Sequence, residues 1–319
     1  MATAQDPTPS TRAARIETLA VPGGALEARF AAGAGMVGCS LRHRGAELLG
    51  LREGIDGYLA RGKTFGIPLL HPWANRLGAW EYAAAGRAVA LDPGSPLLRP
   101  DAHGLPIHGV LPAALDWRST GSGVGAGAAW LTAELDWTAR ADLLAVFPHP
   151  HRLALRAELD GATLRVTTTV HATGDLAVPL SFGFHPYLAP PGAPRERWEV
   201  ELPAMAQLGL DDRGLPTGGR EQRSAERFAL QDRHYDDAFA LRALPAEFAV
   251  SDGTRRIAVV FERGYPFAQI FAPPAPVVIC FEPMTAPVDA LRTHHGLRYV
   301  DPGDRSSAAF AVRVTRPFG

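Results

Sequence analysis

Short segments in which apolar and polar residues alternate run through most of this 319-residue chain. In the stretch HRLALRAELDG, the odd positions carry the apolar residues Leu153, Leu155, Ala157 and Leu159. Because successive side chains of a strand point to opposite faces, a period of two predicts a strand with one buried face. The next segment, ATLRVTTTVHA, alternates in the same way. The Asp160-Gly161 pair between the two segments is typical of a β-hairpin.

Six further segments have strand character and are bounded by turn-forming residues. They are WLTAELDW, RWEVELP, RRIAVVFERG, FAQIFAP, PVVICFEP and AAFAVRVTRP. The 33 glycines and 28 prolines are spread along the whole length, and helical periodicity over twelve or more residues is scarce. This pattern predicts an all-β fold, a large antiparallel β-sandwich with few short helices. We expect a flexible N-terminal tail at residues 1–12 and a single domain at residues 13–319.

Charge and hydropathy exclude several classes of partner. Basic and acidic residues number 32 and 33 and are mixed along the chain, which gives a net charge of −1. A nucleic-acid-binding surface or an anionic membrane contact would need a basic patch, so neither partner is expected. No apolar run approaches twenty residues, and the N-terminus lacks the apolar core of a secretory signal. Cys39 and Cys280 have apolar neighbours and are expected to be free thiols, so the prediction is a cytoplasmic protein.

Two segments match nucleotide-binding patterns without the required context. GYLARGKT, at residues 57–64, fits the phosphate-loop pattern, but Pro68 and Pro72 follow within the helix which that motif requires. GSGVGAGAAW, at residues 121–130, nearly fits the dinucleotide-binding pattern but leads into a strand; it is the best candidate for a linker in a chain that shows no convincing one. We therefore expect no nucleotide cofactor.

Histidine is abundant, but the histidines do not form a recognisable metal site. None of the eleven lies in a zinc-binding pattern. The groups at 149–151 and 294–295 are interpreted as surface or turn residues. No metal is expected.

Polar groups stand where apolar strands meet turns in four stretches. They are PLLHPWANR (68–76), HGLPIHG (103–109), SFGFHPYLAPPG (181–192) and VVICFEPMTAPVDA (277–290). Glu282 lies at the end of one of the most apolar strands, where a carboxylate is costly unless it is paired, hydrogen-bonded or functional. Any one of these residues can be satisfied locally, but four such stretches together indicate a functional site.

From about residue 20 to 319 the sequence resembles the aldose 1-epimerase (galactose mutarotase) family. The resemblance rests on five short elements in the family's order, each weak alone. They are Asn75-Arg76, His108-Gly109, His185-Pro186-Tyr187, Asp236 before an aromatic strand, and Glu282-Pro283-Met284-Thr285. The phosphate-loop match is then accidental, and residues 57–64 lead into the Asn-Arg element of a sugar site.

The resemblance implies an enzyme that interconverts the α and β anomers of a free hexose and needs no cofactor. His185 would be the general acid, and Glu282 the general base. Asn75, Arg76, His108 and Asp236 would bind the sugar, with Asp237 a rival for Asp236. Trp73, Phe184 and Tyr187 either face the sugar ring or pack in the core.

Several alternatives stay open. A hexose-6-phosphate 1-epimerase is one, although no arginine closely follows His108-Gly109; Arg42, Arg44 or Arg99 could bind a phosphate instead. A non-catalytic carbohydrate-binding protein on the same fold is another. The expected partner is a small-molecule sugar, and the protein is expected to be a monomer or homodimer.

Overall fold

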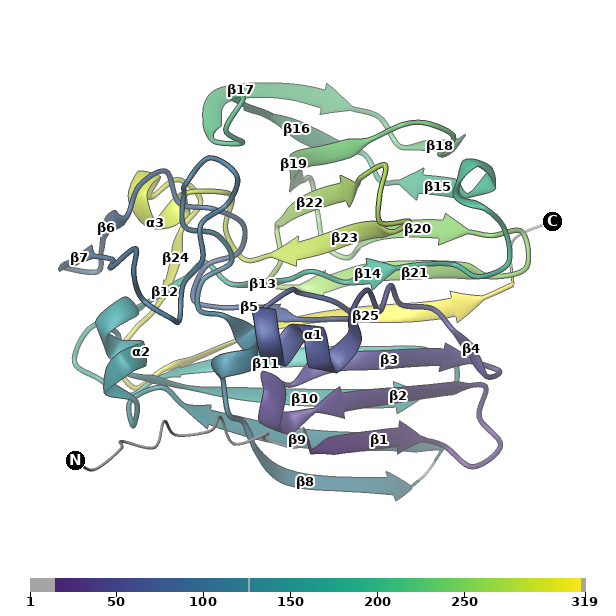
Figure 1. Ribbon diagram of the computed structural model, residues 1–319, viewed down its shortest axis with the longest axis horizontal. Helices are drawn as coiled ribbons and strands as arrows, with labels where there is room; N and C mark the ends of the chain where they lie inside the picture. Colours follow the sequence, from purple (N-terminus) through teal and green to yellow (C-terminus); the bar gives the residue numbers. More distant parts are fainter. Residues whose placement is uncertain (1–14, 126, 317–319) are drawn as a thin grey trace, which may run out of the picture.

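The computed structural model describes residues 15–125 and 127–316 and is built almost entirely of antiparallel strands (Figure 1). The expected all-β sandwich is confirmed. The predicted tail at residues 1–12 lies outside the described residues. The main core takes side chains from Leu19 to Val314, along nearly the whole described length.

The largest sheet has nine strands and forms one layer of the sandwich. In spatial order its strands are β18 (Glu226–Ala229), β15 (Glu199–Leu202), β20 (Ala246–Ser251), β21 (Arg256–Arg263), β25 (Arg305–Thr315), β11 (Thr163–Ala172), β10 (His151–Asp160), β9 (Ala128–Asp136) and β8 (Arg118–Gly125). The predicted hairpin is β10–β11: Asp160 pairs with Thr163, and Gly161 adopts a φ of 57° in the turn. Its four odd-numbered apolar residues are all buried, as the alternation predicted.

The second layer combines an eight-stranded and a four-stranded sheet. The larger one contains β17 (Pro216–Arg223), β16 (Met205–Leu210), β19 (Tyr235–Leu241), β22 (Phe267–Ala272), β23 (Ile279–Met284), β13 (Gly183–Phe184) and β5 (Leu69–Leu70), with β14 (Tyr187–Leu188) also paired to β23. The smaller one contains β1 (Ile16–Ala20), β2 (Leu26–Ala31), β3 (Val37–His43) and β4 (Ala46–Glu47).

Aromatic contacts join the layers. The rings of Phe184 and Phe310 are 4.9 Å apart, and those of Phe248 and Phe281 are 5.5 Å apart. The four-stranded sheet lies against β9 and β10 at the other end of the nine-stranded sheet. Such contacts bury the apolar inner faces of both layers.

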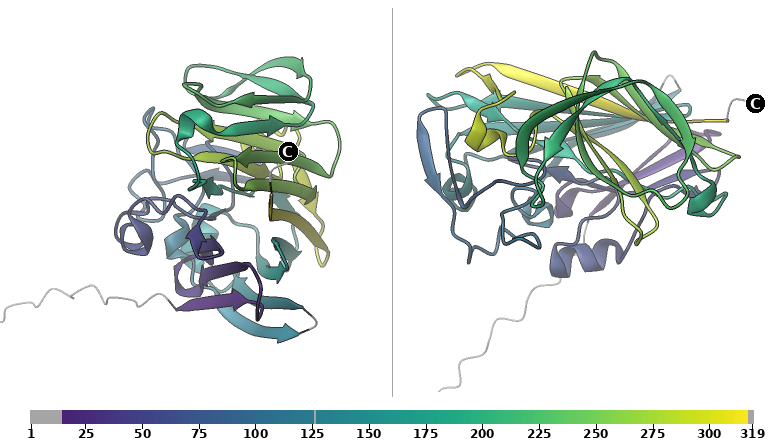
Figure 2. Two further views of the ribbon diagram at one scale, coloured as in Figure 1. Left: turned by 90° about the vertical axis from the view of Figure 1, so that its right-hand side faces the viewer. Right: turned by 90° about the horizontal axis from the view of Figure 1, so that it is seen from above.

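The remaining elements are short. They are the strand pairs β6 (Glu81–Ala84) with β7 (Arg87–Ala90) and β12 (Val178–Leu180) with β24 (Arg298–Val300), the α-helices α1 (Gly54–Arg61), α2 (Ala141–Val146) and α3 (Ala290–Thr293), and the 3₁₀ turns η1 (Ala32–Ala34), η2 (Pro112–Ala114) and η3 (Arg195–Arg197). Figure 2 shows α1 at the periphery of the molecule in both views.

The position of α1 explains why GYLARGKT is not a phosphate loop. The helix ends at Arg61 and so precedes Gly62, whereas a phosphate loop requires a helix that follows the glycine.

The glycine-rich segment at 121–130 is not a linker. Its first five residues belong to β8, which pairs with β9.

Candidate functional site

A pocket of about 370 Å³ brings together all six predicted site residues, which come from segments more than 200 residues apart in the chain. Its walls are formed by Arg52, Lys63, Thr64, Asn75, Arg76, Arg99, Ile107, His108, His185, Tyr187, Asp236, Phe271, Ala275, Pro276 and Glu282. A volume of this size is at the lower end of the range for small-molecule sites.

The two residues predicted to carry the chemistry are in direct contact. Nε2 of His185 lies 3.2 Å from Oε1 of Glu282. Both side chains are deeply buried, with 5% of His185 and 1% of Glu282 exposed. The second carboxyl oxygen of Glu282 and Nδ1 of His185 are buried without a hydrogen-bond partner in the described part of the chain. The pair therefore keeps unused hydrogen-bonding capacity, and both residues line the pocket.

Backbone packing fixes the strand of Glu282 against the segment of His185. Gly183 pairs with Met284, and a Cβ atom at position 183 would lie 2.6 Å from the carbonyl oxygen of Pro283. Only glycine permits so close an approach. The buried Thr285 donates from both its backbone N–H and its hydroxyl to the carbonyl of Phe182, at 2.9 Å each. The Gly183 and Thr285 positions in the two motifs therefore hold the acid–base pair in register.

The Asn-Arg and His-Gly elements lie side by side in unusual backbone conformations. Asn75, His108 and Gly109 have φ values of 55°, 66° and 64°. The N–H of His108 donates to the carbonyl of Asn75 at 2.7 Å. A Cβ atom at position 109 would lie 2.4 Å from the carbonyl oxygen of His71, which explains the glycine after the histidine.

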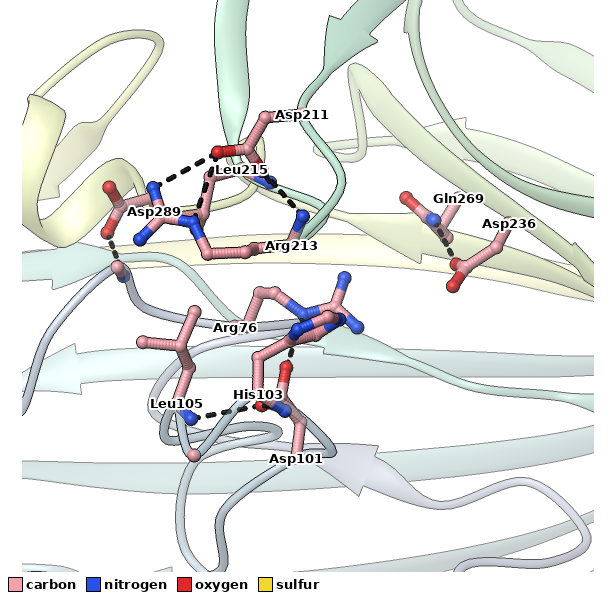
Figure 3. Close-up of polar contacts among 12 residues, drawn as sticks. Arg76, Asp101, His103, Leu105, Asp211, Arg213, Leu215, Asp236, Gln269 and Asp289 are labelled. Carbon is pink, nitrogen blue, oxygen red and sulfur yellow. Dashed lines mark hydrogen bonds and ion pairs between the residues drawn. The ribbon is translucent and has the colours of Figure 1, made fainter.

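Arg76 is held by a carboxylate from the same loop as His108. Its Nε donates to Oδ2 of Asp101 at 2.9 Å, and both side chains are largely buried (Figure 3). Asp101 also accepts from the backbone N–H groups of His103 and Leu105. Most of the charge of Arg76 is therefore balanced inside the protein.

Asp236 and Asp237 point to different neighbours, as alternation along β19 requires. Asp236 lines the pocket and accepts from Nε2 of the buried Gln269 at 2.6 Å (Figure 3). Asp237 accepts from Gln207 at 2.8 Å and is absent from the pocket wall. Gln269 also lies opposite Glu282 in the pairing of β22 with β23, so it occupies the sheet position next to the general base predicted from the sequence.

Burial dominates the electrostatics of the acid–base pair. It lowers the pKa of His185 to about 3, with a further contribution from Arg99. Burial raises the pKa of Glu282 well above its ordinary value, and Asp236 adds to the effect. Both shifts favour the state in which His185 is neutral and Glu282 carries the proton. The pKa of His108 is also lowered well below its ordinary value, first by burial and then by Arg99.

The structure distinguishes the alternatives that the sequence left open for the aromatic residues, and it corrects one expectation for the histidines. Trp73 and Phe184 are buried in the core and do not line the pocket, whereas Tyr187 does. The ring of Tyr187 stacks on that of His185, with centroids 4.2 Å apart. The expectation of a surface or turn position was wrong for His149 and His151, which are fully buried. His151 begins β10 and stacks on Trp137, and His149, two residues before the strand, packs against Phe147. His294 and His295 are exposed, as expected.

Sequence reasoning missed Arg52, Lys63 and Thr64 as pocket residues. Lys63 and Thr64 lie in the accidental phosphate-loop match, and Arg52 precedes that match by five residues. Arg99, named as a possible phosphate ligand, does line the pocket; Arg42 and Arg44 do not.

Residues 15–125 and 127–316 offer neither a metal site nor a membrane-spanning helix. Three or more histidine, cysteine, aspartate or glutamate side chains do not cluster anywhere in these residues in a way that could hold a metal ion. None of the helices there is long and apolar enough to cross a membrane.

Comparison with known proteins decides the family. The family profile described as aldose 1-epimerase matches residues 25–313, about nine-tenths of the chain. The chain belongs to the aldose 1-epimerase family. This family resemblance was predicted from five short motifs, and the profile confirms it.

Solved structures of several proteins share the fold at low sequence identity. Slr1438 from Synechocystis is 22% identical with a TM-score of 0.78; 98% of this chain and 100% of the other are covered. A galactose mutarotase-like protein from Clostridium acetobutylicum is 18% identical with a TM-score of 0.78; 95% of this chain and 99% of the other are covered. Galactose 1-epimerase from Lactobacillus acidophilus is 14% identical with a TM-score of 0.76; 96% of this chain and 100% of the other are covered. No curated protein matches the sequence.

Proposed function

We propose that this member of the family is an aldose 1-epimerase, an isomerase that interconverts the α and β anomers of a free aldose by acid–base chemistry. The observation that carries the proposal is the 3.2 Å contact between Nε2 of His185 and Oε1 of Glu282 in the pocket wall. Opening a sugar ring at the anomeric carbon requires a proton on the ring oxygen and removal of the proton from the C1 hydroxyl. One acid and one base in contact with the same small molecule can supply both.

In this mechanism His185 protonates the ring oxygen O5 while Glu282 takes the proton of the C1 hydroxyl. The C1–O5 bond breaks and the C1–O1 bond becomes a carbonyl, which gives the open-chain aldehyde. Rotation about C1–C2 and the reverse proton transfers close the ring on the other face. Atoms and electrons balance without a metal or a redox cofactor.

Burial of the pair favours one stage of this cycle. Before ring opening, His185 must be protonated and Glu282 ionised. After it, His185 is neutral and Glu282 protonated, the state that the pKa shifts of both groups favour. The proton can pass from Glu282 to His185 across their contact when a sugar enters. We infer that desolvation of the pair helps to stabilise the open-chain intermediate relative to the closed sugar.

The other predicted residues would bind the sugar hydroxyls. Asn75, Arg76, His108 and Asp236 all line the pocket, and Asp236 accepts a hydrogen bond from Gln269. Charged donors and acceptors make the stronger hydrogen bonds to hydroxyls. The two free thiols, Cys39 and Cys280, support action in a reducing compartment such as the cytoplasm.

The test is polarimetry of purified protein on freshly dissolved α-glucose and α-galactose. We expect relaxation to the equilibrium rotation faster than the spontaneous rate and in proportion to enzyme concentration. Measurable binding of these sugars with no acceleration would favour the alternative, a non-catalytic carbohydrate-binding protein.

A further inference from the structure

Two six-residue segments of the chain fold into the same turn. DAHGLP, at residues 101–106, forms the first turn, and DDRGLP, at residues 211–216, forms the second turn. In each, Oδ1 of the aspartate accepts from the backbone N–H groups two and four residues later, at 2.8 to 3.0 Å. The backbone N–H of each aspartate donates to the carbonyl of the leucine at 2.8 Å. The glycines of the two turns have φ values of 75° and 73°.

The two turns meet on either side of Arg76. Leu105 of the first turn, Leu215 of the second turn and Val288 form one small buried cluster. The residue after Val288, Asp289, donates from its backbone N–H to the carbonyl of Arg76 at 3.1 Å. Figure 3 shows Arg76 between the two turns. Three segments that are distant in the sequence therefore enclose this one residue.

The first turn holds Arg76 through a charge. Oδ2 of Asp101 accepts from Nε of Arg76 at 2.9 Å. In the second turn the corresponding oxygen of Asp211 instead accepts from Nη2 of its own Arg213 at 3.1 Å. Because Asp101 takes Nε, the two Nη groups are the donors of Arg76 that can serve a ligand in the pocket.

The second turn meets Arg76 through Gly214. A Cβ atom at position 214 would overlap Nη1 of Arg76 and lie 2.9 Å from its Cζ. At Gly104, the equivalent residue of the first turn, a Cβ atom would meet no atom within 4 Å. The left-handed φ favours glycine in both turns, but only in the second does the guanidinium group also require the absence of a side chain.

We propose that Gly214 is a positioning residue, through which the second turn holds the guanidinium group of Arg76 against Asp101 and directs its remaining donors to the sugar. Arg76 lines the pocket, and its side chain is largely buried between these contacts. A side chain that is already ordered loses less rotamer freedom when a ligand binds, so its hydrogen bonds contribute more to affinity. The inference rests on the proposed function, in which Arg76 binds a sugar hydroxyl.

The test compares Gly214→Ala with Gly303→Ala. Gly303 is exposed and outside the pocket wall, has a φ of 81°, and a Cβ atom there would meet no atom within 4 Å. Both substitutions place alanine in the left-handed region, but only Gly214→Ala displaces the guanidinium group of Arg76.

The measurement is kcat/KM for anomerisation of α-glucose and α-galactose. Gly214→Ala should lower it about 10- to 100-fold, the range for losing a hydrogen bond to a charged group. The loss should lie mainly in KM, because Arg76 binds a hydroxyl that does not react. Gly303→Ala should stay within about twofold of wild type. A value within about twofold for Gly214→Ala as well would overturn the inference.

A double-mutant cycle tests whether Gly214 acts through Arg76. Lysine has no guanidinium group for a Cβ atom at position 214 to displace. Adding Gly214→Ala to Arg76→Lys should therefore change kcat/KM by less than about threefold. Equal losses in the wild-type and Arg76→Lys backgrounds would show that the substitution acts through the fold, and the inference would be wrong.

A measurement without sugar separates this inference from the proposed function. The Nε–H group of Arg76 is bonded to Asp101, so it should give a slowly exchanging ¹⁵N–¹H NMR signal that is absent from Arg76→Lys. Gly214→Ala should shift or broaden this signal, and Gly303→Ala should not. If wild type anomerises neither sugar but the signal responds in this way, the epimerase function fails and the positioning of Arg76 stands. If wild type anomerises a sugar and the signal is the same in both variants, the positioning fails and the epimerase function stands.

Discussion

Replacing Glu282 by glutamine isolates the chemical step from the fold. The amide is nearly the size of the carboxyl group and can keep a hydrogen bond to His185, but it cannot accept a proton from a hydroxyl. A positioned proton transfer typically contributes about 10²- to 10⁴-fold to a rate. We therefore expect kcat to fall by at least ~10², which corresponds to about 2.7 kcal/mol of activation free energy.

The same substitution should change the free energy of unfolding very little. Burial favours the protonated form of Glu282 and the neutral form of His185, and glutamine is a close neutral substitute for a protonated glutamate. We expect a change within about 1 kcal/mol. If the resting pair were a buried ion pair, removing one partner would instead cost about 3–5 kcal/mol. Urea unfolding at pH 7 distinguishes the two values.

The kinetic assay is polarimetry under saturating sugar, with calorimetry to compare sugar affinity. Glu134→Gln is the matched control, because Glu134 lies on the exposed face of β9, paired with Arg118 and outside the pocket. His185→Asn should resemble Glu282→Gln, and the double variant should lose much less than the product of the two effects. A Glu282→Gln protein with wild-type mutarotation would refute the assignment and leave the Glu-Pro-Met-Thr segment a structural role.

Three further predictions follow from other parts of the structure. Because Lys63 is already paired with Glu53, Lys63→Ala should keep the anomerisation rate within a few-fold of wild type, and ATP should not raise the melting temperature. A nucleotide-dependent rise of several degrees would contradict this. Exhaustive EDTA treatment should leave the rate unchanged, and activity lost on chelation and restored by a divalent ion would show that a metal takes part. Burial lowers the pKa of His71 well below its ordinary value and those of His149 and His151 to about 4. At these three histidines, the unfolded chain therefore binds more protons than the folded one between about pH 4 and 6.5. The free energy of unfolding should then fall on acidification by up to about 1.4 kcal/mol per pH unit for each histidine. Urea unfolding at pH 7 and 5 measures this change, and equal stability at the two pH values would disprove it.

The sequence predicts the strands well wherever one face is buried. Alternation in β10 and β11 identifies the buried side chains correctly, because a period of two depends only on local geometry. The same reasoning cannot tell which sheets face each other. The packing of the four-stranded sheet against β9 and β10 depends on contacts between distant segments.

The candidate site was predictable to the extent that its residues lie in short motifs. All six predicted residues line one pocket. Arg52 was not predictable, because it lies in a turn at the start of α1, in no motif, and reaches the pocket through folding of the chain. Trp73 was ambiguous for a different reason: an aromatic residue next to polar residues fits a sugar platform and a core equally well.

The position of β25 bears on how the protein assembles during synthesis. It is the last strand of the described chain, yet it lies in the middle of the nine-stranded sheet, between β21 and β11 (Figure 1). Until residues 305–315 have left the ribosome, the strands on either side of it form two separate half-sheets. Each half-sheet then exposes an unpaired edge strand, β11 in one and the largely apolar β21 in the other, which is a template for pairing with another chain. We expect nascent chains that stall before this strand to depend on chaperones, whereas completed chains close the sheet in a single docking step.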